Sequence, residues 1–322
     1  MSMRERSGTG LGLALLSALT FATSGTFARP LITGEWSAVA VVIARVGIAA
    51  LVLAVPALLV LRGRWPVLRR NALTVVLFGL LGVALAQACF FNAVRYLPVG
   101  VALLLEYLGI VLVVGWMWLV HGQRPRVLTV AGSLTALAGL VFVLDLTGAG
   151  RLDPVGVLWG LGAGVGLAGY YVIAGRVDAD LPSVVMASGG MAVGAAILLL
   201  LGAVGVLPLA AGTADVSFAG HRVSWLVPIV GLSLIAAVVA YLAGVAGARL
   251  LGARLSSFVG LTEVMFAVLI AWLVLNELPS AIQLVGGALI VGGVALVRVD
   301  ELRAGPGEAS SAPVGSALVG ER

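Results

Sequence analysis

Residues 100–114, GVALLLEYLGIVLVV, place a single carboxylate, Glu106, in a stretch that is otherwise apolar. A helix of about 20 apolar residues is long enough to cross the roughly 30 Å hydrocarbon core of a bilayer. A charge at the centre of such a helix costs roughly 2.5–3.5 kcal/mol, which makes Glu106 a candidate functional residue. The question is what the remainder of the chain provides to tolerate this carboxylate.

The composition is that of an integral membrane protein. Of the 322 residues, 61% are hydrophobic and only 10% are charged, whereas about 25% are charged in soluble domains. The mean hydropathy is +1.17. Apolar runs recur along the chain without the alternation of a membrane β-barrel. The predicted fold is therefore all-α, with ten transmembrane helices at about 10–28, 36–61, 71–94, 98–120, 127–146, 154–175, 182–206, 224–248, 255–275 and 280–298.

The arginines predict the orientation of these helices. With the N-terminus inside, fourteen arginines fall in inner loops and tails, and only Arg29, Arg95, Arg151 and Arg222 fall outside. This bias and the even number of spans predict a multi-pass protein of the bacterial cytoplasmic (inner) membrane with both termini cytoplasmic. Residues 1–9 are then the cytoplasmic N-terminus, 207–223 a small polar outer loop, and 299–322 a disordered cytoplasmic tail rich in Gly, Ala, Ser and Pro.

An internal repeat divides the chain into two halves, 10–146 and 154–298. The matches at an offset of 154 residues that apolar composition does not explain are Arg95 with Arg249, Trp118 with Trp272, Pro125 with Pro279, Gly132 with Gly286 and Gly139 with Gly293. Each half holds five predicted helices, so the second must enter the membrane with the opposite orientation. Inverted repeats are associated with secondary transporters that bind substrate near the midplane. A duplicated inert scaffold is the alternative.

Three charged residues lie well inside predicted spans: Arg45, Glu106 and Glu263. Arg45 and Glu106 are both roughly 12–14 Å from the outer ends of their helices, and Glu263 is about 12 Å from the inner end of its own. We expect Arg45 and Glu106 to pair and to line a substrate cavity, with Arg45 binding an anionic group. Glu263 is expected in ion coupling or substrate contact, because buried titratable groups cluster at functional sites. The alternative is that the pair only holds helices together.

Further polar residues fall near the same levels of the predicted bundle. They are Thr23 and Ser24 in the first span, Gln87 in the third, and Tyr241 and Thr262 in the second half. A polar cavity at the midplane would use them as substrate ligands. Alternatively, the hydroxyl groups bond to backbone carbonyls one turn earlier, which is common in transmembrane helices.

Several function classes are disfavoured. Cys89 is the only cysteine, so no cysteine-based metal cluster is expected, and no cofactor is predicted. The G-x-G-x-x-G at Gly164–Gly169 lies in an apolar run, which favours helix packing over dinucleotide binding. With no H-E-x-x-H and no intramembrane histidine, an enzyme is a poor fit. A channel or a receptor-like binding protein is the alternative to a transporter. The expected partners are a small-molecule substrate, the lipid bilayer and a coupling proton, with no nucleic acid; a homodimer is compatible with the pattern.

The sequence resembles a known transporter family. The resemblance rests on FFNAVRYLPVGVALLLEYLGIVLVVGWMWLVHGQRP at 90–125, ARLLGARLSSFVGLTEVMFAVLIAWLVLNELP at 248–279, and the duplicated ten-span plan. These features resemble the EamA-type transporters of the drug/metabolite transporter superfamily. The resemblance implies a ten-helix exporter of small metabolites, often amino acids, driven by an ion gradient, and Arg45 matches an arginine usual in the second span. The sequence departs from the family at Ile110 and Val264, where a proline is often found.

Overall fold

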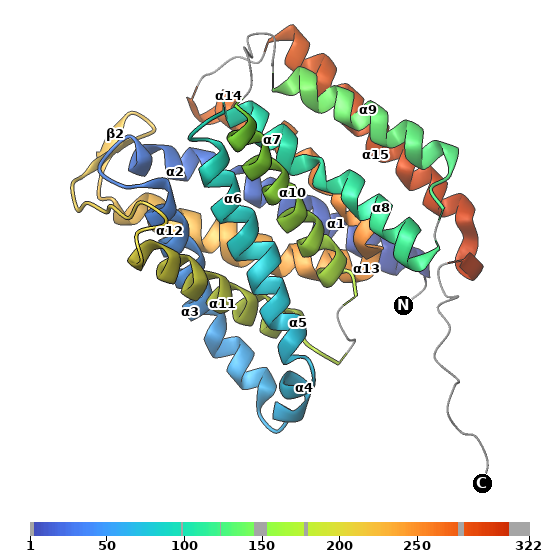
Figure 1. Ribbon diagram of the computed structural model, residues 1–322, viewed down its shortest axis with the longest axis horizontal. Coiled ribbons are helices and arrows are strands. Elements are labelled where there is room, and N and C mark those ends of the chain that lie inside the picture. Colours follow the sequence, from blue (N-terminus) through green and yellow to red (C-terminus); the bar gives the residue numbers. More distant parts are fainter. Residues whose placement is uncertain are drawn as a thin grey trace.

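The computed structural model describes residues 3–97, 99–122, 124–144, 153–176, 180–275 and 280–308. Nearly all of these residues are helical (Figure 1). The first half contains α1 (Met3–Ala22), α2 (Ser24–Ile32), α3 (Ala38–Leu61), α4 (Trp65–Arg70), α5 (Ala72–Leu77), the π-helix η1 (Phe78–Leu85), α6 (Ala86–Ala93), α7 (Val99–Tyr107), α8 (Gly109–His121) and α9 (Val127–Val143). The second half contains α10 (Pro154–Ala174), α11 (Ser183–Ala203), β1 (Val216–Phe218), β2 (His221–Val223), α12 (Leu226–Ser233), the π-helix η3 (Leu234–Val239), α13 (Ala240–Gly260), α14 (Thr262–Leu275) and α15 (Ala281–Glu308).

Local sequence explains where several helices begin and end. The Ser37 hydroxyl accepts a hydrogen bond from the Ala40 amide at the start of α3, at 3.2 Å. Asp153 accepts bonds from two amides at the start of α10, and Pro154 occupies the first turn, where a missing N–H costs nothing. At its other end, α8 stops at Gly122, whose φ of 66° favours glycine.

Eight helical segments are long and apolar enough to cross a membrane, within the part of the chain that the structure describes. They coincide with eight of the ten predicted spans. The predicted span 127–146 corresponds to α9, which has 17 residues. The predicted span 224–248 corresponds to α12, η3 and the part of α13 before Gly252, where non-helical backbone kinks the chain. The predicted span 255–275 corresponds to the part of α13 after this kink together with α14.

Two predicted loop regions differ from expectation. The 207–223 segment contains a two-stranded antiparallel hairpin, in which Val216 pairs with Val223. Ala219 and Gly220 both have positive φ, as a tight two-residue hairpin turn requires. The helix α15 continues through Glu308, so residues 299–308 of the predicted disordered tail are helical. Residues 309–322 of that tail lie outside the described residues.

The internal repeat is visible in the backbone. The π-helices η1 and η3 end at Leu85 and Val239, which are 154 residues apart, the offset found in the sequence. The helices α9 and α15 lie side by side (Figure 1) and cross at glycines. A Cβ on Gly132 would lie 2.7 Å from the Gly293 carbonyl oxygen, and one on Gly139 would lie 2.5 Å from that of Gly286.

These glycine contacts relate the two halves by an approximate two-fold axis. At the offset of 154, Gly132 corresponds to Gly286 and Gly139 to Gly293. Gly132 contacts Gly293, the equivalent of Gly139, and Gly139 contacts Gly286, the equivalent of Gly132. The numbering rises along α9 while it falls along α15, which means that these equivalent helices run antiparallel. The small residues let the two backbones approach closely, as is common between membrane helices.

The two halves interlock rather than forming separate lobes. The most extensive packing joins helices of opposite halves: α9 with α15, α1 with α13, α3 with α11, and α10 with η1 and α6. Any cavity inside the bundle is therefore walled by both repeats.

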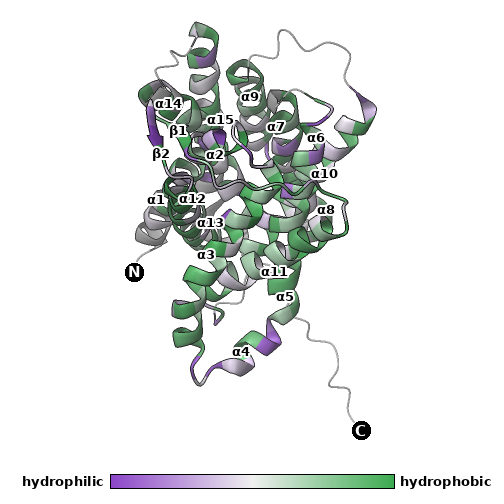
Figure 2. Cartoon of the chain, turned by 90° about the vertical axis from the view of Figure 1, so that its left-hand side faces the viewer, coloured by the Kyte–Doolittle hydropathy of each residue, from purple (hydrophilic) through white to green (hydrophobic). Residues whose placement is uncertain are grey.

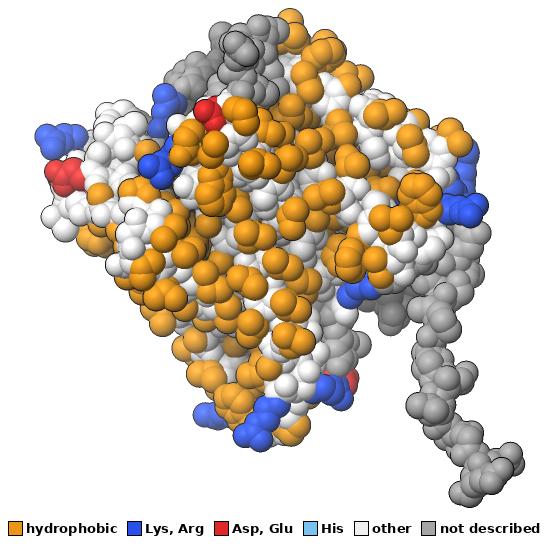
Figure 3. Space-filling model, viewed as in Figure 1, with side chains coloured by type: hydrophobic (Ala, Val, Ile, Leu, Met, Phe, Trp, Pro, Cys, Tyr) orange, Lys and Arg blue, Asp and Glu red, His pale blue; other side chains and the backbone are white. Residues whose placement is uncertain are grey.

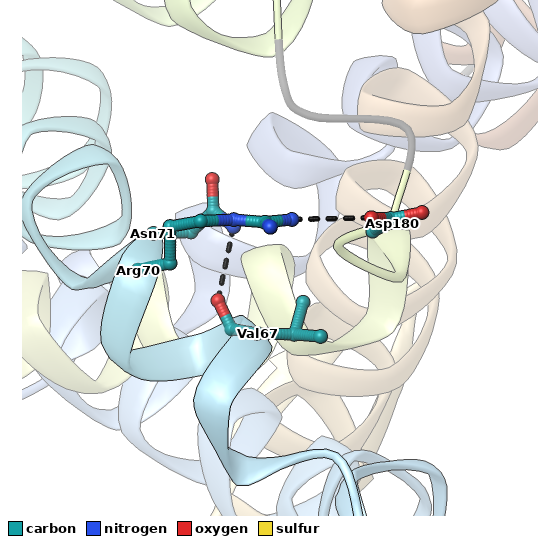
Figure 4. Close-up of polar contacts among 4 residues, drawn as sticks. All are labelled: Val67, Arg70, Asn71 and Asp180. Carbon is teal, nitrogen blue, oxygen red and sulfur yellow. Dashed lines mark hydrogen bonds and ion pairs between the residues drawn. The ribbon is translucent and has the colours of Figure 1, made fainter.

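The surface fits a protein embedded in lipid. Apolar side chains cover the face seen in Figure 3, with arginines gathered at its edges. In Figure 2, hydrophilic residues concentrate at the β-hairpin and around α4, at opposite ends of the bundle. Beside α4, the Arg70 guanidinium lies 3.1 Å from the Asp180 carboxylate, and the Asn71 amide donates to the Val67 carbonyl (Figure 4). Both charged side chains are more than half exposed, so this ion pair contributes little to stability.

Candidate functional site

A cavity of about 780 Å³ lies within the bundle, walled by helices of both repeats. Its polar and aromatic lining residues are Ser17, Phe21, Ser24, Thr26, Arg29, Thr33, Arg45, Gln87, Phe90, Phe91, Glu106, Tyr107, Tyr170, Tyr171, Tyr241, Ser256 and Glu263. All three predicted intramembrane charges therefore face one space. This arrangement explains how an apolar helix tolerates Glu106: the carboxylate faces an internal cavity that it shares with Arg45 and Glu263, rather than lipid.

The cavity opens at the end of the bundle that carries the hairpin. Its lining includes Arg29, Ile32 and Thr33 at the exposed end of α2. The hairpin packs on this helix, with the rings of Phe218 and Phe27 stacked 5.6 Å apart. Toward the opposite end, the helices close tightly, and a Cβ on Gly247 would lie 2.9 Å from the Ala14 amide nitrogen.

Arg45 is held by a π-helix of the other repeat. Its guanidinium donates a 2.6 Å hydrogen bond to the carbonyl oxygen of Ala236 in η3 and lies 5.2 Å from the centroid of the Phe21 ring. π-Helical turns displace backbone carbonyls from regular α-helical bonding and are frequent at functional sites. The Nε of Arg45 is buried without a hydrogen-bond partner among the described residues. The guanidinium therefore retains a donor, and an anionic group is the ligand it fits.

Both glutamates lie beside a one-residue interruption between consecutive helices, called a helix break below, at which the backbone keeps right-handed helical φ and ψ. Glu106 is in the last turn of α7, just before the break at Leu108, and Glu263 is in the first turn of α14, just after the break at Leu261. The breaks occur although Ile110 and Val264 stand where the resembling family often has proline. At the start of a helix, the macrodipole favours a negative charge such as that of Glu263. Its carboxylate is also hydrogen-bonded to the Tyr107 side chain, which comes from the first repeat.

The predicted ion pair between Arg45 and Glu106 is not formed among the described residues. Arg45 instead interacts electrostatically with Glu263, and the two glutamates interact with each other. The prediction placed Arg45 and Glu106 at a common depth, which the shared cavity agrees with. Depth alone, however, does not determine which way each side chain points around its helix.

The other predicted residues divide into two groups. Gln87, Tyr241 and Ser24 line the cavity, whereas Thr23 and Thr262 are not part of its lining. The three hydroxyl groups of Thr23, Ser24 and Thr262 donate to backbone carbonyls three residues earlier, at 2.5–2.7 Å. For these three hydroxyl groups, the structure therefore agrees with the alternative interpretation, in which they bond to the backbone.

Sequence reasoning identified Tyr241 but missed the other aromatic residues of the lining. Phe21 and Tyr241 have ring centroids 5.1 Å apart, Tyr241 and Tyr170 are 5.9 Å apart, and Tyr170 and Tyr171 are 5.0 Å apart. This row leads from Arg45 across the cavity toward the glutamates. The doubled aromatics at 90–91 and 170–171 were the available signal, but aromatic residues in an apolar helix are most often core residues.

An interior cavity that contains three charged side chains and is shared by two repeats with antiparallel equivalent helices defines the class of protein: a membrane transporter. The model of the EamA-like transporter family matches residues 8–145 and again 154–299. The chain belongs to the EamA-like transporter family.

Two further comparisons agree with this assignment. The uncharacterized inner membrane transporter YicL of Salmonella typhimurium is 25% identical over 239 residues, covering 73% of this chain and 76% of the relative. A protein of known crystal structure superposes with a TM-score of 0.74 at 23% identity, covering 92% of this chain and 99% of the other. The second likeness concerns the fold alone. Together with the apolar helices, the relative supports a multi-pass protein of the inner membrane.

Proposed function

We propose that this transporter is a secondary active exporter of a small metabolite, such as an amino acid or a related amphiphile, that works by alternating access and is coupled to protons. The observation that carries the proposal is the convergence of Arg45, Glu106 and Glu263 on one cavity that reaches the hairpin end of the bundle. A guanidinium and two carboxylates provide for both charged groups of a zwitterion. The aromatic walls suit an apolar side chain.

In this proposal the three charges have different tasks. Arg45 binds the anionic group of the substrate, because it retains an unpaired donor. Glu106 binds an amine or a proton, since no hydrogen bond holds its side chain among the described residues, whereas Glu263 is engaged by Tyr107. Exchange of a proton for the substrate amine at a carboxylate would couple the two fluxes.

We further propose ten membrane helices arranged as two inverted five-helix repeats, with both termini cytoplasmic. Support comes from the antiparallel α9 and α15 and from the non-helical Gly252, which separates the eighth predicted span from the ninth. The cavity mouth then faces outward, as in an exporter that has just released its substrate.

Accumulation against a gradient tests the proposed function. Inside-out vesicles with an acidic interior should take up candidate amino acids saturably, to a concentration above that of the medium, and a protonophore should abolish the excess. The main alternative, a channel, would stop at equal concentrations, and a receptor-like binding protein would give no flux. Either result would refute active transport.

The exchange variant Arg45→Glu with Glu106→Arg tests the roles of the charges. It preserves net charge but places each charge where the other was. A glutamate at position 45 cannot donate to the Ala236 carbonyl, so transport is compared only if the variant elutes as a monodisperse protein. We then expect no transport, because the substrate would meet the wrong charge at each position. Full recovery of flux would contradict the binding role of these two residues.

A further inference from the structure

Two adjacent tyrosines of α10 line the cavity, and their hydroxyl groups fit against glycines of α13, one of which, Gly244, lies about one turn from the close contact at Gly247. A Cβ added to Gly244 would overlap the Tyr170 hydroxyl, and one added to Gly260 would overlap the Tyr171 hydroxyl. All four residues line the cavity. The two glycines thus provide notches that bulkier residues would fill.

The same contacts place both parts of α13 at one level. Gly244 and Gly260 are sixteen residues apart, which is about 24 Å along a straight helix. Adjacent tyrosines cannot reach across that distance, so the chain must fold back at Gly252, where φ is 80° and ψ is 166°. Each glycine is eight residues from Gly252. The two tyrosines therefore contact both segments of α13 in a single layer across the bundle.

One hydroxyl in this layer is unsatisfied. The Tyr170 oxygen is buried and has no hydrogen-bond partner among the described residues. Its neighbour Ser17 donates to the Ala240 carbonyl instead, at 2.8 Å. A buried hydroxyl without a partner destabilises the arrangement that contains it. The closed layer is thus tightly packed but is destabilised by the unsatisfied Tyr170 hydroxyl. This destabilisation would disappear if water reached the hydroxyl and formed a hydrogen bond with it.

The first repeat lacks these notches. At the offset of 154, the counterparts of Gly244 and Gly260 are Phe90 and Glu106, and both line the open part of the cavity. Large side chains at these positions keep the equivalent helices apart at the hairpin end, whereas glycines let them close at the other end.

We infer that Tyr170 and Tyr171, fitted into the notches at Gly244 and Gly260, form the gate that closes the cavity toward the face opposite the hairpin. The gate opens when the hydroxyl groups leave the notches, and the unsatisfied Tyr170 hydroxyl keeps the closed gate from being too stable to open. This inference rests on alternating access, which is part of the proposed function.

Cysteine accessibility tests the gate without requiring transport. The reporter is Ala253→Cys in a Cys89→Ser background, because Ala253 is buried beside Tyr171 and does not line the cavity. Purified protein in detergent is treated with a small thiol reagent, so the result does not depend on membrane orientation. The labelling rate then measures how often the contact between α10 and α13 opens.

Three variants have distinct expected effects. Gly260→Ala should raise the labelling rate several-fold, because its methyl group displaces the Tyr171 hydroxyl, and adding Tyr171→Phe should reverse most of that rise. Tyr170→Phe, which keeps the ring but removes the unsatisfied hydroxyl, should lower the rate about ten-fold. Gly12→Ala is the matched control, since nothing lies within 4 Å of its added Cβ.

Two results would overturn the gate. One is a labelling rate for Tyr170→Phe equal to that of the parent. The other is a labelling rate for Gly260→Ala no higher than that for Gly12→Ala, provided that Gly260→Ala elutes as a folded protein. These outcomes are separable from failure of the proposed function: a gate that responds as expected in a protein without concentrative uptake would refute active transport alone.

Discussion

The crossing of α9 and α15 predicts a large difference between two neighbouring glycine substitutions. A Cβ on Gly293 would lie 2.6 Å from the Gly132 carbonyl oxygen and 2.7 Å from the backbone nitrogen and Cβ of Ala136. A Cβ on Gly292 would meet nothing within 4 Å. Each Gly→Ala change gains a similar helix propensity, up to about 1 kcal/mol, so this gain cancels when the two variants are compared. The remaining difference is overpacking, which costs about 1–3 kcal/mol.

Thermal unfolding of the purified protein in detergent measures this difference. For a chain of this length, 1 kcal/mol corresponds to on the order of 2 °C in the midpoint temperature. Gly293→Ala should therefore unfold several degrees below Gly292→Ala, which is its matched control. Gly132→Ala should show a similar loss, because it acts on the same crossing from the other helix. Equal midpoints for Gly292→Ala and Gly293→Ala would refute the close crossing.

Three further outcomes follow from the fold and the site. Ser217→Cys, in the exposed hairpin, should react with an impermeant maleimide on intact cells in a Cys89-free background; labelling only after lysis would reverse the proposed orientation. Glu263→Gln should change the pH dependence of uptake, and an unaltered rate and pH profile would make the residue structural. Thr129→Val should lower the free energy of unfolding by about 1–3 kcal/mol in a denaturation series, because it leaves the buried Asp300 carboxylate without its 2.5 Å hydrogen bond; an unchanged midpoint would contradict this.

Hydropathy located most of the membrane helices because burial in lipid requires about 20 consecutive apolar residues, a strong and local signal. The helix breaks at Leu108 and Leu261 left no such signal, since neither sits at a proline. The hairpin was missed for a related reason: its strands have three residues each, and only Ala219 and Gly220 mark the turn. Short elements of this kind are determined by tertiary contacts more than by sequence pattern.

The charges of the site were predictable, whereas its geometry was not. Arg45, Glu106 and Glu263 were identifiable because a charge inside a membrane is costly and therefore rare. Residue counting gave their depths but not their directions, so it predicted an ion pair between Arg45 and Glu106, whereas Arg45 donates to the Ala236 carbonyl. The anchor of Arg45 is a backbone carbonyl in a π-helix, and neither the carbonyl nor the π-helix has a residue signature. Tyr107, Tyr170 and Tyr171 were overlooked because aromatic residues in an apolar helix are most often core residues.

The two repeats have equivalent helices, but their charged residues occupy non-equivalent positions. This difference places both carboxylates on the same side of the cavity. At the offset of 154, Glu106 corresponds to Gly260 and Glu263 to Gly109. The chain enters α7 from the hairpin end, whereas it approaches that end along α14. In both helices, then, the carboxylate lies nearer the hairpin and the glycine about 4.5 Å further from it.

Both glycines pack against α10: a Cβ on Gly109 would overlap the carbonyl oxygen of Gly164, and one on Gly260 would overlap the Tyr171 hydroxyl. The non-equivalent positions therefore place two carboxylates on the open side of the helix breaks and two close glycine contacts on the other side. Exact duplication would instead have put one carboxylate on each side of the midplane. The two repeats therefore differ at these four positions, Glu106, Gly109, Gly260 and Glu263, although their helices remain equivalent. This difference places both carboxylates on one side of the midplane.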